Sequence, residues 1–263
     1  MKKIWIIAAL VVMCLIGTVV ADVPAATLKV NGVPVDLGNL AISQEGSGDN
    51  VQQTYELSQP IITPDYTIQN VIVNTKEDPQ VSYGLAIIDS GAPSTFSFTF
   101  NTPINPVIAG PNQVHSSMSL SATDGGSNGV TVTSVAPPVG IPVDSDGITE
   151  MQVTTVFDGS VRKNIGLDLG GPGITFLPKS QSSTWGPFNE GFVSGPVSAT
   201  GWNNIQININ FQGSGFGDIY TLNGRSDIVK PPTIPEFPTM ALPAALVVGL
   251  IGSILFVKST KED

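Results

Sequence analysis

The chain has 263 residues, a formal net charge of −10 and only 12% charged residues, together with 28 glycines and 21 prolines. This composition excludes a protein built from long amphipathic helices, and the acidic balance argues against binding to nucleic acid or anionic lipid. His115 is the only histidine and Cys14 the only cysteine, which excludes most metallohydrolase, Ser-His-Asp and thiol mechanisms. The sequence therefore predicts a protein that is not an enzyme, with no catalytic residue assigned.

The N-terminal residues have the pattern of a secretory signal peptide, predicted to span residues 1–21. Lys2 and Lys3 precede an apolar run over residues 4–20, and small residues lie where a signal peptidase would cut after Ala21. A retained N-terminal anchor is the alternative, because the run is long for a signal peptide. Cleavage removes Cys14, so the body has no cysteine and no disulfide.

Residues 22–229 are predicted to form an extracellular domain of short strands. Phe96, Phe98 and Phe100 alternate with serine and threonine, and the apolar side chains after Ile205 alternate with glutamine and asparagine. This period of two is typical of strands with one buried face and one wet face. Short strands separated by frequent turns predict an all-β, antiparallel β-sandwich of the jelly-roll or Greek-key type. The expected strands are 27–30, 33–37, 53–57, 66–74, 81–88, 95–101, 114–122, 129–135, 148–157, 161–169, 204–212, 218–222 and 225–229.

The connections between these strands carry their own predictions. Asn31-Gly32 and Asn223-Gly224 have the residues that two-residue β-hairpin turns require. Residues 43–50 and 185–199 are expected to be loops. The proline-rich stretch 136–142 is either a linker that divides the body or a crossover between two sheets of one domain.

Candidate ligand-binding residues are few. Asp144, Asp146 and Glu150 offer carboxylates around Gly147, a set that suits Ca²⁺, although a β-turn is the alternative. No other cofactor is indicated. Trp185 and Trp202 lie near an expected loop, where their rings either stack on sugars or pack in the core.

Two acidic residues and the histidine complete the candidates. Glu150 and Glu190 are the acids that a paired-carboxylate glycoside hydrolase would use, with solvated surface acids as the alternative. His115 is expected to be a partly exposed strand residue.

The C-terminal residues have the sequence of a stalk followed by a membrane anchor. Residues 230–239 are rich in proline, and residues 240–257 supply 18 uncharged residues, close to the roughly 20 that a membrane-spanning helix needs. Lys258 and Lys261 follow in the tail 258–263. Positive charges favour the cytoplasmic side, so the body is expected at the cell surface, outside the membrane.

A tetrad directly before this span has a recognisable pattern. Pro235-Glu236-Phe237-Pro238, with a later Leu242-Pro243 step, resembles the PEF-CTERM sorting signal of exported archaeal proteins. The resemblance implies an archaeosortase-type processing enzyme in the membrane, which cuts the tail near the tetrad and transfers the body to a surface anchor. The body is loosely similar to exported β-sandwich proteins with the bacterial PEP-CTERM signal, a likeness that implies no functional residue.

Three functions follow from these features. The leading hypothesis is a non-enzymatic cell-surface or envelope protein held by its sorting signal. The alternative is a surface carbohydrate-binding or adhesion module, with or without calcium, whose partners are envelope glycans or other surface proteins. A secreted glycoside hydrolase is the third.

Overall fold

A computed structural model describes residues 25–38, 40–46, 51–76, 79–108, 112–137, 148–157, 162–169, 174–176, 182–193 and 201–229. The predicted signal peptide, stalk, sorting tetrad and membrane span lie outside these ranges, as do Asp144 and Asp146. The regular structure within the described ranges consists of β-strands. No helix long and apolar enough to cross a membrane occurs in this part of the chain.

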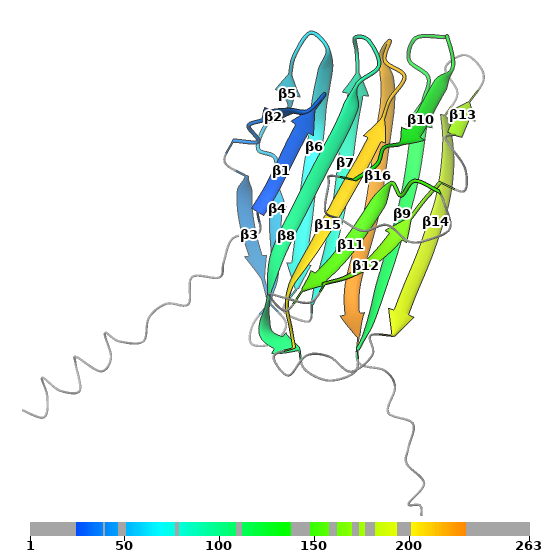
Figure 1. Cartoon of the computed structure of the whole chain (residues 1–263). Coiled ribbons are helices and arrows are strands. Elements are labelled where there is room, and N and C mark those ends of the chain that lie inside the picture. The colour runs from blue at the N-terminus through cyan, green and yellow to red at the C-terminus, as the bar shows by residue number, and fades with distance from the viewer. Residues whose placement is uncertain are drawn as a thin grey trace, which may run out of the picture. The chain divides into compact units, whose positions relative to one another are not determined.

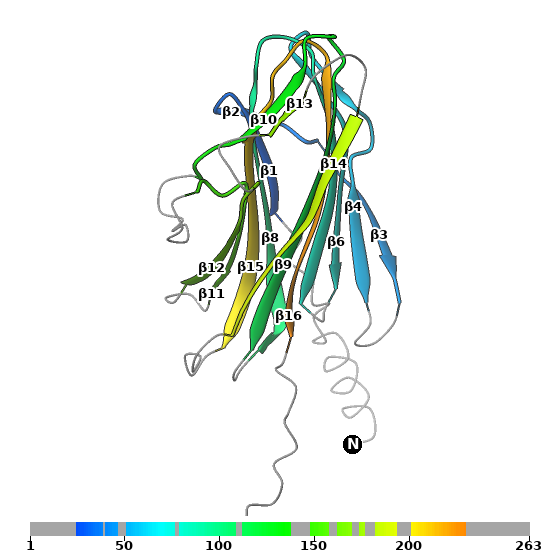
Figure 2. The same cartoon turned by 90° about the vertical axis from the view of Figure 1, so that its right-hand side faces the viewer.

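Two antiparallel eight-stranded sheets make up the body, and Figure 2 shows them nearly edge-on. The first sheet runs in the order β12 (Arg162–Leu167), β11 (Gln152–Phe157), β15 (Trp202–Gln212), β8 (Thr95–Ile108), β1 (Ala25–Val30), β2 (Val33–Val35), with β10 (Val130–Ser134) and β13 (Ile174–Phe176) joined beside β15. The second runs in the order β14 (Ser182–Val193), β9 (Gln113–Thr123), β16 (Asp218–Val229), β7 (Gln80–Asp89), β6 (Tyr66–Lys76), β4 (Gln52–Glu56), β3 (Ala41–Glu45), with β5 (Ile61–Ile62) beside β6.

The strand pairs are nested, as in a jelly roll. β7 pairs with β16, β8 with β15, β9 with β14, β10 with β13 and β11 with β12. The strands from β7 to β16 therefore follow the order of one long antiparallel hairpin, and its outer pairs alternate between the two sheets. Figure 1 shows where these strands lie. The predicted antiparallel β-sandwich is confirmed.

The core lies between the sheets and is formed by the predicted apolar faces. Phe96, Phe98 and Phe100 of β8 are 0%, 0% and 1% exposed. The ring of Phe96 stacks on Phe211 of β15, with the ring centroids 5.2 Å apart. Each buried phenylalanine contributes on the order of 1.5–3 kcal/mol relative to an exposed one, and the adjacent strands β8 and β15 together bury four of them.

The first predicted hairpin is confirmed in detail. β1 and β2 pair around Asn31-Gly32, whose φ angles are 52° and 79°. Both values lie in the left-handed region that a type I′ turn requires.

The second predicted hairpin is wrong. Residues 218–229 form one continuous strand, β16, which pairs with β7 on one side and β9 on the other. Gly224 lies opposite Tyr83, and a Cβ there would come within 2.4 Å of the Tyr83 ring. The glycine is present because a neighbouring ring approaches the backbone, and not because the chain turns.

Two predicted loops are also wrong in part. Residues 182–193 form the edge strand β14, which pairs with β9 and is interrupted by a bulge between Trp185 and Phe188. Gly186-Pro187 lies in this bulge, where proline is tolerated because no ladder hydrogen bond is needed. β3 covers residues 41–45, the first part of the other expected loop.

The polar face of β15 is only partly wet, contrary to the predicted alternation. Asn208 and Asn210 are 1% and 3% exposed. Asn208 Oδ1 accepts a hydrogen bond of 2.9 Å from Thr99 Oγ1 on β8. Glu150, itself 1% exposed, lies directly over Gly166 of β12 and helps to cover this end of the sheet.

The proline-rich stretch 136–142 lies mostly outside the described residues. β10 on one side of it and β11 on the other both pair with β15. Both sides therefore contribute to the same sheet.

Candidate functional site

The outer face of the first sheet has a groove lined almost entirely by uncharged polar side chains. Its volume is about 540 Å³, and we call it the amide groove. The lining residues come from five adjacent strands that lie together in Figure 1. They are Thr27, Thr99, Asn101, Phe157, Arg162, Asn203, Asn204 and Gln206.

The strand register places these side chains in rows across the sheet. Asn101 of β8 lies directly opposite Gln206 of β15, and Thr27 of β1 lies opposite Thr99. Because successive side chains alternate between faces, the same strands direct their phenylalanines and isoleucines into the core. The groove therefore lies on the outer face of strands whose inner faces carry buried phenylalanines and isoleucines.

One end of the groove is formed by a cation stacked on an aromatic ring. Arg162 and Phe157 are cross-strand partners on β12 and β11, and the Arg162 Cζ lies 5.5 Å from the centre of the Phe157 ring. Such a contact orients the guanidinium and contributes about 0.5–1 kcal/mol at an exposed site. Among the described residues no carboxylate forms an ion pair with Arg162.

The neighbouring amides lie at an irregularity in the pairing of β15 with β8. The register between β15 and β8 shifts between Trp202 and Asn204, and the successive residues Asn203 and Asn204 both line the groove. Regular pairing would direct successive side chains to opposite faces, and the irregularity is where two successive amides line one groove. The Asn204 Oδ1 atom is buried and accepts no hydrogen bond from the described residues.

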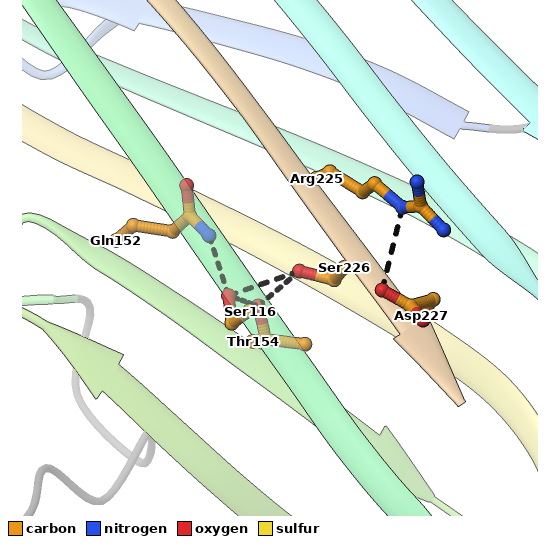
Figure 3. Close-up of polar contacts among 6 residues, drawn as sticks. All are labelled: Ser116, Gln152, Thr154, Arg225, Ser226 and Asp227. Carbon is orange, nitrogen blue, oxygen red and sulfur yellow. Dashed lines mark hydrogen bonds and ion pairs between the residues drawn. The ribbon is translucent and has the colours of Figure 1, made fainter. Parts of the chain in front are cut away.

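A second polar cluster lies inside the sandwich, between the two sheets (Figure 3). Gln152 Nε2 donates to Ser116 Oγ at 2.7 Å, and the Ser116 hydroxyl lies 2.9 Å from Thr154 Oγ1. Ser226 Oγ is 2.7 Å from Thr154 Oγ1 and 3.1 Å from Ser116 Oγ, and Tyr83 donates its hydroxyl to Gln152 Oε1.

This inner cluster has the features of a structural network and not of a catalytic site. Ser116, Gln152, Thr154 and Ser226 are at most 3% exposed, and the network contains no histidine and no charged side chain. Burial raises the pKa of the Tyr83 hydroxyl well above its usual value, so this group stays a hydrogen-bond donor. The cluster joins the two sheets through satisfied hydrogen bonds. The Arg225–Asp227 ion pair drawn beside it, at 3.4 Å, has an exposed arginine side chain.

A pair of carboxylates is buried where β7 and β16 meet. Asp89 and Asp218 are directly opposite each other, and both are 0% exposed. Asp218 Oδ2 accepts from Ser214 Oγ at 2.6 Å, and Asp89 Oδ2 accepts from the Ser94 amide at 3.0 Å. Burial raises the pKa of the Asp89 carboxyl; hydrogen bonds from Ser94 and Gly215 oppose this rise, and the charge of Asp218 adds to it.

The two tryptophans have core contacts. Trp202 is 2% exposed and belongs to the hydrophobic core, which leaves no ring face for a sugar. Trp185 is partly buried on β14 and packs against the same core. The sequence left open whether these rings stack on sugars or pack in the core, and Trp202 packs in the core.

The remaining predicted residues do not come together in a described site. Glu150 is buried beside Gly166, whereas Asp144 and Asp146 and the side chain of Glu190 lie outside the described residues. No three histidine, cysteine, aspartate or glutamate side chains of the described ranges are grouped to hold a metal ion, and calcium binding stays a prediction. His115 is exposed on β9, with its Nε2 atom 3.3 Å from Gln113 Oε1.

Sequence reasoning missed the amide groove. The alternating amides of β15 were a usable signal, because they marked a polar outer face. The pairing of β15 with β8 and β11, which brings Asn101 and Phe157 to that face, depends on long-range contacts that no local pattern contains.

Similarity to solved structures is low. A structure of TmCBM61 in complex with β-1,4-galactotriose is 11% identical over 57% of this chain and 71% of that chain, with a TM-score of 0.25. The enzymatically active domain of bacteriophage CBA120 tailspike protein 4 is 11% identical over 74% of this chain and 20% of that chain, with a TM-score of 0.20. No curated protein matches the chain in sequence.

A family model matches the tail of the chain. The model is the PEF-CTERM archaeal protein sorting domain, and the match covers residues 234–252. It includes the tetrad Pro235-Glu236-Phe237-Pro238 and the first part of the apolar run that follows. The chain therefore carries a PEF-CTERM archaeal sorting signal at residues 234–252, as the tetrad predicted.

Proposed function

We propose that the chain is an exported, non-enzymatic surface protein whose β-sandwich body is displayed outside an archaeal cell. An archaeosortase-type enzyme recognises the tail, cuts it near the Pro235-Glu236-Phe237-Pro238 tetrad and transfers the body to a surface anchor. The observation that carries this proposal is the sorting-domain match at residues 234–252. The predicted signal peptide at residues 1–21 supports the export step.

The body supports a role in display and not in catalysis. Its polar interior cluster, Ser116, Gln152, Thr154, Ser226 and Tyr83, is closed off from solvent and already hydrogen-bonded. The buried acids Asp89 and Asp218 accept hydrogen bonds from neighbouring groups of the body. These polar groups are therefore closed off from a substrate in solution.

The intact mass of the protein recovered from its native envelope tests the proposal. We expect a chain that is truncated near Pro235 and carries an added anchor group. A mass equal to that of a chain with an uncut tail would contradict the sorting step.

A matched pair of variants separates recognition of the tetrad from a general effect of proline loss. Pro235→Ala with Phe237→Ala changes the tetrad, whereas Pro231→Ala with Pro232→Ala changes two prolines outside the matched residues. We expect only the first pair to leave the tail uncut. Equal processing of both pairs would show that the tetrad is not the recognised feature.

A further inference from the structure

We propose that the amide groove is a binding site for a neutral oligosaccharide. The inference rests on the geometry of the first sheet and is independent of how the body is anchored. The groove is open to solvent and has a volume of about 540 Å³. Its lining runs from Thr27 and Asn101 through Gln206 to Phe157 and Arg162. That volume lies within the range of small-molecule sites, about 300–1,000 Å³.

The chemistry of the lining matches hydroxyl groups. A sugar hydroxyl both donates and accepts hydrogen bonds, and so do the side chains of asparagine, glutamine and threonine, which supply six of the eight lining residues. Asn204 lines the groove, and its Oδ1 atom accepts no hydrogen bond from the described residues.

The aromatic end of the groove supplies the remaining contact. Arg162 packs on Phe157, with its Cζ 5.5 Å from the ring centre, so its N–H groups are held at the edge of the groove. The guanidinium has five donors in a fixed plane, which suits neighbouring hydroxyls on one sugar ring. The half-buried Phe157 ring provides an apolar surface beside it.

The dimensions suit a chain of linked sugars. The lining spans five neighbouring strands, and strand spacings of about 4.8 Å give a groove roughly 19 Å long across the sheet. The groove is open, so a polysaccharide can continue beyond it.

Other classes of ligand fit the groove less well. Arg162 is the only charged residue among the described residues of the lining, and the whole chain has a net charge of −10, so a polyanion such as nucleic acid would be repelled. A peptide strand needs free backbone groups, but β8 and β15 already pair on both sides.

Calorimetric titration of the full chain tests the proposal. The protein is kept in a detergent without a sugar headgroup, because an alkyl glycoside would compete for the groove. The probes are neutral gluco-, galacto-, manno- and xylo-oligosaccharides, together with oligouronates. We expect at least one neutral oligosaccharide to bind, with an affinity that is insensitive to salt because no ion pair is formed.

Variants then locate the binding. Phe157→Ala and Gln206→Ala are each expected to weaken binding by about tenfold or more. Arg162→Ala should weaken binding similarly. Lys163→Ala is the matched control, because Lys163 is the next residue of β12 and has the same charge, but its side chain points to the opposite face of the sheet. Thermal melting of each variant establishes that it is folded.

Three outcomes would overturn the proposal. The first is no heat of binding for any neutral oligosaccharide. The second is binding that Lys163→Ala weakens as much as Arg162→Ala does. The third is binding of the oligouronates alone, abolished by high salt, which would assign the groove to acidic glycans.

Discussion

The charged form of the Asp89 carboxyl is destabilised by burial, and its hydrogen bonds do not fully offset this effect. The carboxyl is buried opposite Asp218, one of its oxygens accepts from the Ser94 amide, and its Oδ1 atom has no partner among the described residues. Burial raises the pKa of this group in the folded protein. An acid with a raised folded pKa destabilises the protein above that pKa, and the cost disappears as the pH falls below the unfolded value.

We therefore predict that Asp89→Asn stabilises the body at neutral pH. Asparagine keeps an oxygen for the Ser94 amide and removes the charge that faces Asp218. Thermal melting at pH 7 should show a rise in Tm of roughly 2–4 °C, which corresponds to about 1 kcal/mol for a body of this size.

The pH dependence of the gain distinguishes a charge effect from a packing effect. The difference in Tm between Asp89→Asn and wild type should shrink as the pH is lowered towards 3, where the Asp89 carboxyl is protonated in both the folded and the unfolded wild-type protein. Asp65→Asn is the control, because Asp65 is exposed, and its Tm should be unchanged. A gain that is constant across this pH range would show that charge is not its cause.

At the scale of the element, β16 shows where local sequence is misleading. Asn223-Gly224 has the composition of a hairpin turn, yet it lies in the middle of a strand that pairs on both sides. Tyr83 stacks on Phe100 with ring centroids 5.6 Å apart and bonds to Gln152, so its ring is fixed above Gly224. The contact joins strands far apart in the chain, and no turn rule contains that information.

We predict that Gly224→Ala destabilises the body by about 1–3 kcal/mol, the usual cost of overpacking a fixed core. Urea unfolding measures the change. Gly84→Ala is the control on β7, because its new Cβ would meet only Asn223 Oδ1, at 3.3 Å, on an exposed side chain. If Gly224→Ala were as mild as Gly84→Ala, the ring would not be the reason for the glycine.

Strands with strict alternation were predictable, and interrupted ones were not. β8 and β15 have an apolar side chain at every second position, and their predicted core faces are confirmed. β14 contains Gly186-Pro187, which suggests a loop, but the bulge between Trp185 and Phe188 absorbs both residues without ending the strand. The buried end of the β15 amide face also depends on Glu150, whose position over Gly166 is set by tertiary structure.

At the scale of the whole molecule, the fold class and the sorting signal were predictable because each depends on patterns within contiguous segments: alternating strands for the fold and the tetrad for the signal. The amide groove was not, because its residues come from five strands between positions 27 and 206. Trp202 was expected near a loop, but the register of β15 places its ring in the core. The sequence therefore indicated the sorting signal more readily than the amide groove.

The last described strand, β16, ends at Val229, and the described residues up to that point form one compact unit. We predict that a body truncated after Val229 melts within about 2 °C of the full chain, a difference of less than about 1 kcal/mol. Circular dichroism measures both melts. A large loss of Tm would mean that residues 230–263 contribute to the stability of the body.

The central position of β16 also bears on the timing of folding. β16 is the last described strand to leave the ribosome, yet it fills the place between β7 and β9. A growing chain that lacks residues 218–229 has a second sheet with an open gap, and its nested pairs have the large sequence separations that make folding slow. For a chain exported as proposed, we expect this topology to delay completion of the second sheet until residues 218–229 have been made.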